Sequence, residues 1–242
     1  MLDSWINDNS RPVIFIGSNS AIFLLVDLCE QHNIKIEGII DSDYFGNTDT
    51  IEGIPVIDTE LSFNDPERLE YYRSNFNFFL ATNWLPDNNE TQIRNRQKRD
   101  ALIELIERLD LPCISLVDNS ARVHKTNQIG KNVTIDALCY VSPKNVIGDY
   151  TNIFAGVMVG YHNVIGKNVV FQRMAGIMHY NQVGDNVYVG LHSQICVNEI
   201  TISSGTVLHP CMAIKRNTKE NELISLAGKD LRKVYPYHTI IE

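Results

Sequence analysis

The chain has 242 residues and a formal charge of −8, which allows two modest domains with their own cores and argues against a nucleic-acid-binding surface. Its five cysteines are odd in number and scattered without metal-type spacing, which favours a reducing compartment over a disulfide framework. No apolar run is long enough to span a membrane, and the first residues lack the basic start of a signal peptide, so we expect a cytoplasmic protein.

The first part of the chain predicts an α/β domain over residues 1–112. A short polar arm, residues 1–10, precedes an expected strand at 13–16, a turn, a helix at 21–31 and a second strand at 35–40. This order is a βαβ unit, whose parallel strands imply a small doubly wound, Rossmann-like sheet. The pattern continues with expected strands at 54–57 and 76–81 and expected helices at 66–74 and 88–109.

The turn at residues 17–20 is the first candidate binding element. Gly17 and the free amides after it stand at a helix N-terminus, where an anionic phosphate is favoured. Asp41 and Asp43 end the second strand, where such folds often hold an acid near a ribose. The turn lacks the second and third glycines of a dinucleotide fingerprint, which argues against NAD. From these residues alone, a plain strand-to-helix connection and a nucleotide site both stay open.

The helix at 88–109 carries a basic first half with Arg94, Arg96, Lys98 and Arg99. A run of charges on a helix is usually a solvated face, so we expect these side chains to face water. Contact with a substrate phosphate is the alternative.

From Val117 an apolar residue returns at every sixth position as far as Ile195, and after one extra residue the series resumes at Ile202. Each hexad suits a short strand and a tight corner, so three hexads make one coil of a parallel β-helix with the apolar residue inside. Ordinary strands of a sandwich would alternate and have irregular spacing. The β-helix domain is expected over 113–242, with residues 223–242 capping its last coil.

Asparagines mark the expected corners of the coil. Asn132, Asn168 and Asn186 each follow a hexad residue by three positions. Asparagine and glycine tolerate the left-handed backbone conformation best, so we expect that conformation at these corners.

Hexads of this kind resemble those of the left-handed β-helix acyltransferases. Together with the α/β half, nearly the whole chain is similar to the sialic acid O-acetyltransferase and bacillosamine N-acetyltransferase family of sugar acyltransferases. The resemblance implies acetyl-CoA as the donor, a UDP- or dTDP-linked amino sugar as the acceptor, a homotrimer and a role in bacterial surface-glycan synthesis, such as lipopolysaccharide or capsule. It further implies that the nucleotide is held by the turn and the strand-end acids, namely Gly17, Ser18, Asn19, Ser20, Asp41 and Asp43.

The same resemblance locates the candidate catalytic segment at residues 159–166. The base of that family is a histidine, but Tyr161 occupies its expected position here and His162 follows one residue late. We assign His162 as the base, with Tyr161 orienting the substrate. A corner histidine without a catalytic task is the open alternative, because a shift of one residue turns a side chain to another face.

The expected coenzyme groove also departs from the pattern of that family. Phe154 and Val170 replace polar residues, and Pro210 lacks the amide proton that a pantetheine arm would accept. His179, Gly190 and Leu191 are the remaining candidates for binding the donor. These departures leave open a non-catalytic or altered-donor homologue that has lost the acetyl-CoA site. Four histidines of the β-helix, His162, His179, His192 and His209, are unevenly spaced, so we expect no metal site.

Overall fold

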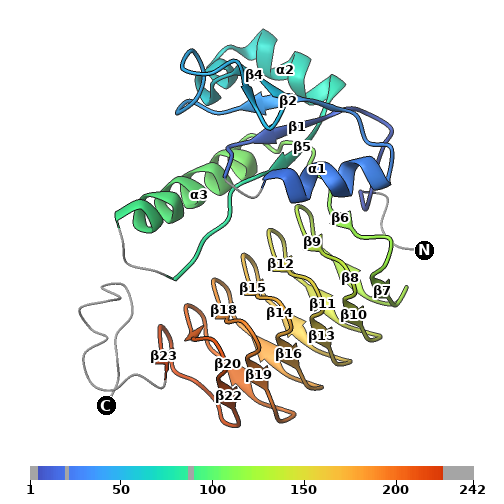
Figure 1. The fold of residues 1–242 in the computed structure, drawn as a ribbon, viewed down its shortest axis with the longest axis vertical. Helices are drawn as coiled ribbons and strands as arrows, with labels where there is room; N and C mark the ends of the chain where they lie inside the picture. Colours follow the sequence, from blue (N-terminus) through green and yellow to red (C-terminus); the bar gives the residue numbers. More distant parts are fainter. Residues whose placement is uncertain (1–4, 20–21, 87–89, 226–242) are drawn as a thin grey trace. The chain divides into compact units, whose positions relative to one another are not determined.

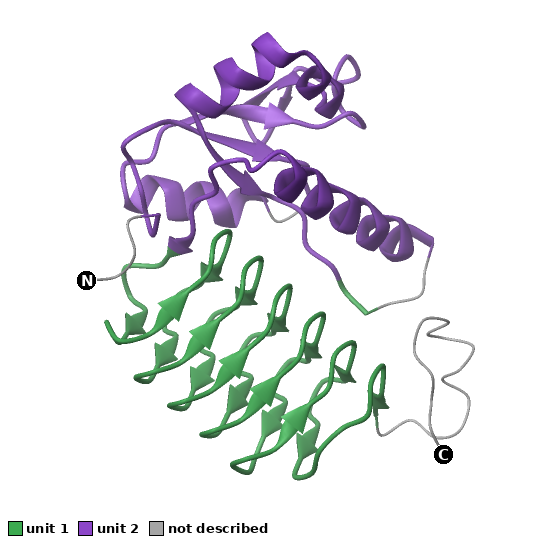
Figure 2. Ribbon diagram, turned by 180° about the vertical axis from the view of Figure 1, so that it is seen from behind, with its two compact units in different colours: residues 1–3, 85–89, 117–242 green, residues 4–84, 90–116 purple. Residues whose placement is uncertain are grey.

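The computed structural model describes residues 5–19, 22–86 and 90–225 of the chain (Figure 1). The chain divides into two compact units (Figure 2). One unit comprises Ser4–Trp84 with Glu90–Leu116, and the other comprises Val117–Glu242 with the short segments Met1–Asp3 and Leu85–Asn89. Ser20 and most of the expected C-terminal cap lie outside the described residues.

The N-terminal unit contains a five-stranded sheet in the order β3-β4-β2-β1-β5. Its strands are parallel except β3, which runs antiparallel to β4 at the edge. The strands and helices predicted from the sequence are all present within one or two residues of their expected ends, whereas β3 and the short helix η1 were not predicted. In chain order the elements are β1 (Val13–Ile16), α1 (Ile22–Gln31), β2 (Ile36–Ile40), β3 (Thr50–Ile51), β4 (Ile54–Asp58), η1 (Glu60–Asn64), α2 (Pro66–Asn75), β5 (Asn77–Leu80) and α3 (Glu90–Arg108).

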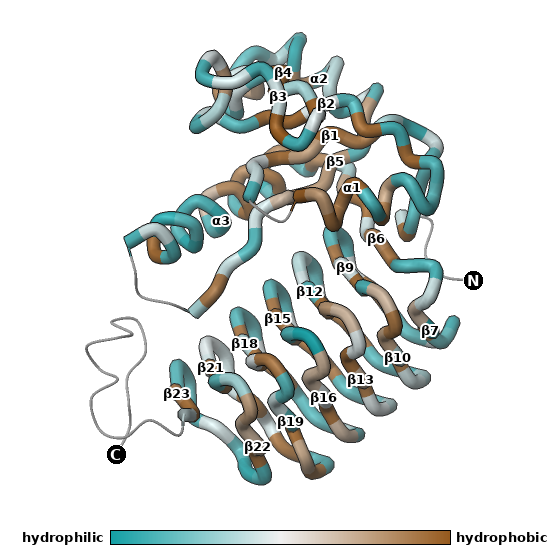
Figure 3. Tube along the Cα trace, viewed as in Figure 1, coloured by the Kyte–Doolittle hydropathy of each residue, from teal (hydrophilic) through white to brown (hydrophobic). Residues whose placement is uncertain are grey.

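The central strands of this sheet are hydrophobic (Figure 3), and their side chains are buried, which explains the position of the sheet inside the unit. On one face, Phe15 and Phe79 belong to a buried cluster with residues of α1. On the other face, Phe78 packs edge-on against Phe63 of η1, which in turn contacts Tyr72 of α2. Strands buried on both faces have continuous apolar sequences, as β1 does throughout and β5 does after Asn77.

Residues 5–7 pair with the chain at Ser115, whereas a short polar arm was expected over residues 1–10. Ile6 makes a parallel bridge with Ser115, and the amide of Asn7 donates to the carbonyl of Ser115 at 2.8 Å. The sequence prediction was wrong here because two or three paired residues leave no periodic pattern to detect.

Residues 116–224 form a parallel β-helix with three sheets of seven, six and five strands. Strands eighteen residues apart pair in parallel, as in Val141↔Val159 and Ile147↔Ile165. The coil therefore confirms the hexad prediction, while its handedness stays a prediction. The strands are β6 (Leu116–Val117), β7 (Arg122–Val123), β8 (Gln128–Ile129), β9 (Thr134–Ile135), β10 (Tyr140–Val141), β11 (Val146–Ile147), β12 (Asn152–Ile153), β13 (Met158–Val159), β14 (Val164–Ile165), β15 (Val170–Phe171), β16 (Gly176–Ile177), β17 (Gln182–Val183), β18 (Tyr188–Val189), β19 (Gln194–Ile195), β20 (Thr201–Ile202), β21 (Val207–Leu208), β22 (Ala213–Ile214) and β23 (Leu223–Ile224).

The hexad residues fill the inside of the coil. Every hexad residue from Ile129 to Ile214 is buried. The corner asparagines Asn132, Asn168 and Asn186 have φ angles of 56°, 55° and 56°, which confirms the left-handed conformation expected there. The core of this unit is thus a single column that each coil extends.

Candidate functional site

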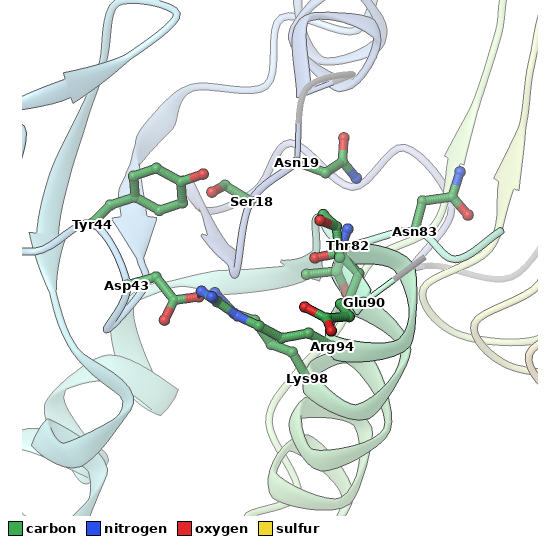
Figure 4. Close-up of a pocket in the computed structure, with 11 residues that line it drawn as sticks. Ser18, Asn19, Asp43, Tyr44, Thr82, Asn83, Glu90, Arg94 and Lys98 are labelled. Carbon is green, nitrogen blue, oxygen red and sulfur yellow. The ribbon is translucent and has the colours of Figure 1, made fainter. Parts of the chain in front are cut away.

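A pocket of about 490 Å³ lies in the N-terminal unit (Figure 4). Four segments build it: the turn after β1, the loop after β2, the segment after β5 and the first half of α3. The carboxyl ends of neighbouring parallel strands meet at one edge of a sheet, which is where ligands of open α/β sheets bind. Its lining residues are Ser18, Asn19, Asp43, Tyr44, Thr82, Asn83, Glu90, Thr91, Arg94, Asn95 and Lys98.

The structure brings most of the predicted nucleotide-binding residues together here. Ser18, Asn19 and Asp43 line the pocket. Asp41 is completely buried beside it and accepts a hydrogen bond from the Ser18 hydroxyl at 3.0 Å. The side-chain Nδ2 of Asn19 donates to the carbonyl of Ala81 at 2.8 Å, which connects the turn after β1 to the end of β5.

Gly17 starts the turn in a conformation that suits glycine. Its φ angle is +69°, and a Cβ added there would lie 2.6 Å from Cγ2 of Thr82 and 2.8 Å from Cδ1 of Leu102. A side chain would therefore strain the backbone and push the segment after β5 away from the turn. Gly17 contributes to the site by allowing this close approach.

Lys98 joins the two predicted acids. Its Nζ donates to Oδ1 of Asp41 at 2.6 Å and to Oδ2 of Asp43 at 2.8 Å. The hydrogen bond from Lys98 holds the pKa of Asp43 below its usual value, with smaller contributions from charge attraction to Lys98 and Arg94. Burial alone would lower the pKa of Lys98, but the hydrogen bonds to the two carboxylates raise it. Lys98 and Asp43 therefore both stay charged at neutral pH.

The basic half of α3 is not the solvated face that the sequence predicted. Arg99 is 1% exposed and donates to the carbonyl of Thr82, and the Lys98 side chain is 20% exposed. Arg94 is more open, with its side chain 73% exposed and one guanidinium nitrogen 3.4 Å from Oδ2 of Asp43. The prediction failed because the first half of α3 lines the pocket, so its side chains border the pocket rather than bulk water.

Sequence reasoning missed the lining residues that follow β5. Thr82 and Asn83 come directly after a buried strand, a position that could have singled them out. The Thr82 hydroxyl is buried and has no hydrogen-bond partner among the described residues. A buried hydroxyl without a partner is costly, so it is suited to bond a ligand that enters the pocket.

A second group of candidate residues lies at one corner of the β-helix. Tyr161 and His162 follow β13, and His179 and Tyr180 occupy the same corner one coil later, after β16. Tyr161 stacks on His179 with ring centroids 3.8 Å apart and an interplanar angle of 14°. His162 stacks on Tyr180 at 4.9 Å and 13°. The structure therefore brings the predicted catalytic pair and the predicted donor-binding histidine side by side.

His162 is exposed at this corner and has a φ angle of 58°. Its ring nitrogens make no hydrogen bond within the part of the chain that the structure describes, so they are accessible to a substrate. Its role as the base stays a prediction.

Gly190 and Leu191 lie at a different corner, after β18. The amide of Gly190 donates to the carbonyl of Leu208 at 2.9 Å, so it is used within the coil. A backbone donor from this pair would therefore be the amide of Leu191, which makes no hydrogen bond among the described residues. Their part in binding the donor stays a prediction, and within one chain they are separate from His179.

No three or more His, Cys, Asp or Glu side chains in the described ranges are grouped so that they could hold a metal ion. Among the helices that the structure describes, none is long and apolar enough to cross a membrane.

These features define a two-part chain, in which a mixed α/β sheet with a polar pocket precedes a three-sided parallel β-helix. No family model and no curated protein sequence matches the chain. A histidine-to-asparagine mutant of perosamine N-acetyltransferase from Caulobacter crescentus, solved in complex with CoA and GDP-perosamine, is similar at a TM-score of 0.74 and 18% identity, covering 91% of this chain and 96% of that chain.

Two further solved structures are similar. WeeI from Acinetobacter baumannii has a TM-score of 0.71 and 16% identity, covering 89% of this chain and 97% of that chain. The acetyltransferase domain of PglB from Neisseria gonorrhoeae has a TM-score of 0.50 and 18% identity, covering 88% and 96%. The resemblance to β-helix sugar acyltransferases that the hexads indicated is thus confirmed at the level of the fold.

Proposed function

We propose that this chain is an enzyme that transfers an acetyl group from acetyl-CoA to a nucleotide-linked amino sugar. One observation carries the proposal: a polar pocket at the strand ends of a chain whose fold matches an N-acetyltransferase solved with CoA and a GDP-linked sugar. The proposal includes a Rossmann-like domain over 1–112, a left-handed β-helix over 113–242, a homotrimer, a cytoplasmic location and a role in surface-glycan synthesis. A triangular coil suits threefold packing, which supports the trimer.

The pocket is suited to the nucleotide part of such a substrate. A diphosphate needs cations, and Lys98 is already balanced by Asp41 and Asp43. Arg94 is exposed and only weakly held by Asp43, so it is the cation that can turn to a phosphate. The helix N-terminus after Asn19 and the Thr82 hydroxyl add hydrogen-bond donors. A neighbour in fold was solved with a GDP-linked sugar. We therefore add guanosine diphosphate to uridine and thymidine diphosphate as candidate nucleotides of the substrate.

The β-helix corner is suited to the transfer itself. Acyl transfer from a thioester needs a base, an oxyanion donor and a groove for the donor. In this proposal His162 takes the proton of the sugar amine, Tyr161 orients the substrate, and His179, Gly190 and Leu191 contact the donor. Replacing His162 by alanine should lower turnover by about 10²–10⁴-fold, and near-normal turnover would exclude it as the base.

Titration calorimetry of the purified protein tests the proposal. Acetyl-CoA and at least one of uridine, thymidine or guanosine diphosphate should bind in the micromolar range. Arg94→Gln should weaken binding of the nucleoside diphosphate by about ten- to hundredfold, because a hydrogen bond to a charged group is worth about 1.5–3 kcal/mol. Arg108→Gln, the same change at the exposed far end of α3, is the control and should bind like the parent.

The outcomes separate the alternatives. Nucleotide binding without coenzyme binding would refute acetyl transfer and favour a homologue with another donor or none. Equal losses in the Arg94 and Arg108 variants would show that the diphosphate does not lie at the first half of α3.

A further inference from the structure

The imidazole of His179 is held in one orientation by several independent contacts. The amide of Tyr161 donates to its Nδ1 at 3.1 Å, and the Tyr161 ring stacks on it. The backbone amide of His179 in turn donates to Oδ1 of Asn198 at 3.0 Å. A Cβ at Gly160 would overlap Nδ1, so only glycine at this position leaves room for the ring.

The extra residue in the hexad series falls at this same corner. Paired strands that precede this corner in the chain are eighteen residues apart, as Val164 and Gln182 are, whereas Gln182 pairs with Thr201, nineteen residues later. The longer corner contains Asn198, whose side chain holds the backbone of His179. The extra residue, which is the one irregularity of the coil between Val117 and Ile214, therefore lies in the corner that holds the backbone of His179 in place.

These contacts decide which nitrogen of His179 carries the proton. A neutral imidazole has one N–H and one acceptor nitrogen, and Nδ1 is the acceptor because an amide N–H points at it. The proton is therefore on Nε2, which has no hydrogen-bond partner in the described ranges. His179 offers a fixed N–H donor and cannot accept a proton while the Tyr161 contact lasts. His162 differs, because both of its nitrogens lack partners among the described residues.

We infer that His179 donates its Nε2–H to the carbonyl oxygen of the acetyl thioester, while His162 acts as the base. This inference rests on the acetyl transfer proposed above. The amine nitrogen attacks the carbonyl carbon, a C–N bond forms, and the carbonyl electron pair moves to the oxygen that His179 contacts. The electron pair on the oxygen then re-forms the C=O bond as the C–S bond breaks, and the sulfur leaves with the electron pair of that bond. His162 accepts the amine proton and passes it to the sulfur, which gives the amide and free coenzyme A.

Two substitutions separate a donor from a structural ring. Glutamine places an amide N–H near the position of Nε2, whereas asparagine reaches only the position of Nδ1 and can keep the Tyr161 contact. His179→Asn should lower kcat by about 10²–10³-fold, the usual effect of removing one oxyanion donor. His179→Gln should stay within about tenfold of the parent, since it retains the donor. His124→Asn, at an exposed position of an early coil where the ring Nδ1 also makes a hydrogen bond, to Oγ1 of Thr126, is the matched control and should leave kcat unchanged.

The proton position is read independently of activity. In ¹⁵N NMR of the free protein with labelled histidine, assigned through His179→Asn, we expect a neutral ring with a proton on Nε2 and none on Nδ1. A proton on Nδ1, or a charged ring at neutral pH, would overturn the inference. It would also be overturned if His179→Asn were as active as the parent, or if glutamine were no better than asparagine. Absence of acetyl-CoA binding or turnover in the parent would instead refute the proposed function, and the acyl step with it.

Discussion

Replacing Lys98 by methionine tests the charge network beside the pocket. Methionine keeps most of the length of the side chain and removes the ammonium group. The carboxylate of Asp41 is 0% exposed, and Nζ of Lys98 lies 2.6 Å from its Oδ1. After the change, Asp41 keeps the Ser18 hydroxyl and the Asp43 amide as its donors among the described residues. Breaking a buried ion pair by removing one partner costs about 3–5 kcal/mol, so we expect a loss of this size in the free energy of unfolding.

Tryptophan fluorescence during urea denaturation measures this loss of stability in the N-terminal unit. The only two tryptophans of the chain, Trp5 and Trp84, both belong to the N-terminal unit. Their emission therefore follows the unfolding of that unit and not of the β-helix. Arg108→Met, at the exposed end of the same helix, is the control and should change stability by less than about 0.5 kcal/mol.

A second substitution shows whether the buried charge is the cause. Adding Asp41→Asn to Lys98→Met removes the unpaired carboxylate but keeps an acceptor for Ser18, so the double variant should recover most of the loss. The reasoning would be refuted if Lys98→Met cost less than about 1 kcal/mol, or if the double variant were no more stable than the single one.

The same network predicts how the loss depends on pH. The pKa of Asp43 is lowered in the folded state, so its contribution is present above its unfolded pKa of about 3.9 and is lost as the pH falls through the lower folded value. The pKa of Lys98 is raised, so its contribution is present below about 10.4 and is lost only above the raised folded value. The difference between the parent and Lys98→Met should therefore shrink in acid and stay constant through neutral pH.

Three further changes are predicted. Gly17→Ala should cost about 1–3 kcal/mol in the same fluorescence assay, because its Cβ would lie 2.6 Å from Cγ2 of Thr82; parent-like stability would contradict the geometry. Asn186→Val should destabilise the β-helix by about 1–2 kcal/mol, because the φ angle of 56° at this position disfavours a β-branched residue. Circular dichroism during thermal unfolding measures the effect, and an unchanged transition would show that the corner relaxes without cost. Burial raises the pKa of Cys139 to about 11, so Ellman's reagent at about pH 8 should label the exposed Cys211 first and Cys139 only after unfolding; prompt labelling of Cys139 would show an open corner.

Much of the fold could be predicted because it is encoded locally. Each hexad specifies its own strand and corner, so the inward residues from Ile129 to Ile214 and the asparagine corners follow from the sequence alone. The βαβ order likewise follows from alternating apolar strands and helices. The pairing of Ile6 with Ser115 could not be found in this way, because a single bridge between distant residues has no period.

The pocket was predicted only in part, for a physical reason. The turn at Gly17 and the strand-end acids are marked by residue type and position. Ser18, Asn19 and Asp43 line the pocket, and their binding of a nucleotide stays a prediction. The face that α3 turns to the sheet is set by packing. Its basic residues alone do not distinguish an ion pair such as Lys98 with Asp41 from a side chain in water. The sequence therefore predicted one wall of the pocket and assigned the opposite wall to solvent.

The β-helix corner illustrates how position and chemistry can separate in a repeating fold. One coil is eighteen residues, so Tyr161 must lie against His179 and His162 against Tyr180, as the structure has them. Tyr161 occupies the position where a histidine was expected, and the next coil places the ring of His179 against it, 3.8 Å away between centroids. The eighteen-residue period does not predict which nitrogen of His179 carries the proton. That position depends on the hydrogen bond from the Tyr161 amide and on the room for the ring that Gly160 leaves. In such a coil, the role of a histidine is decided by the backbone groups of its neighbouring coil as much as by its own place in the repeat.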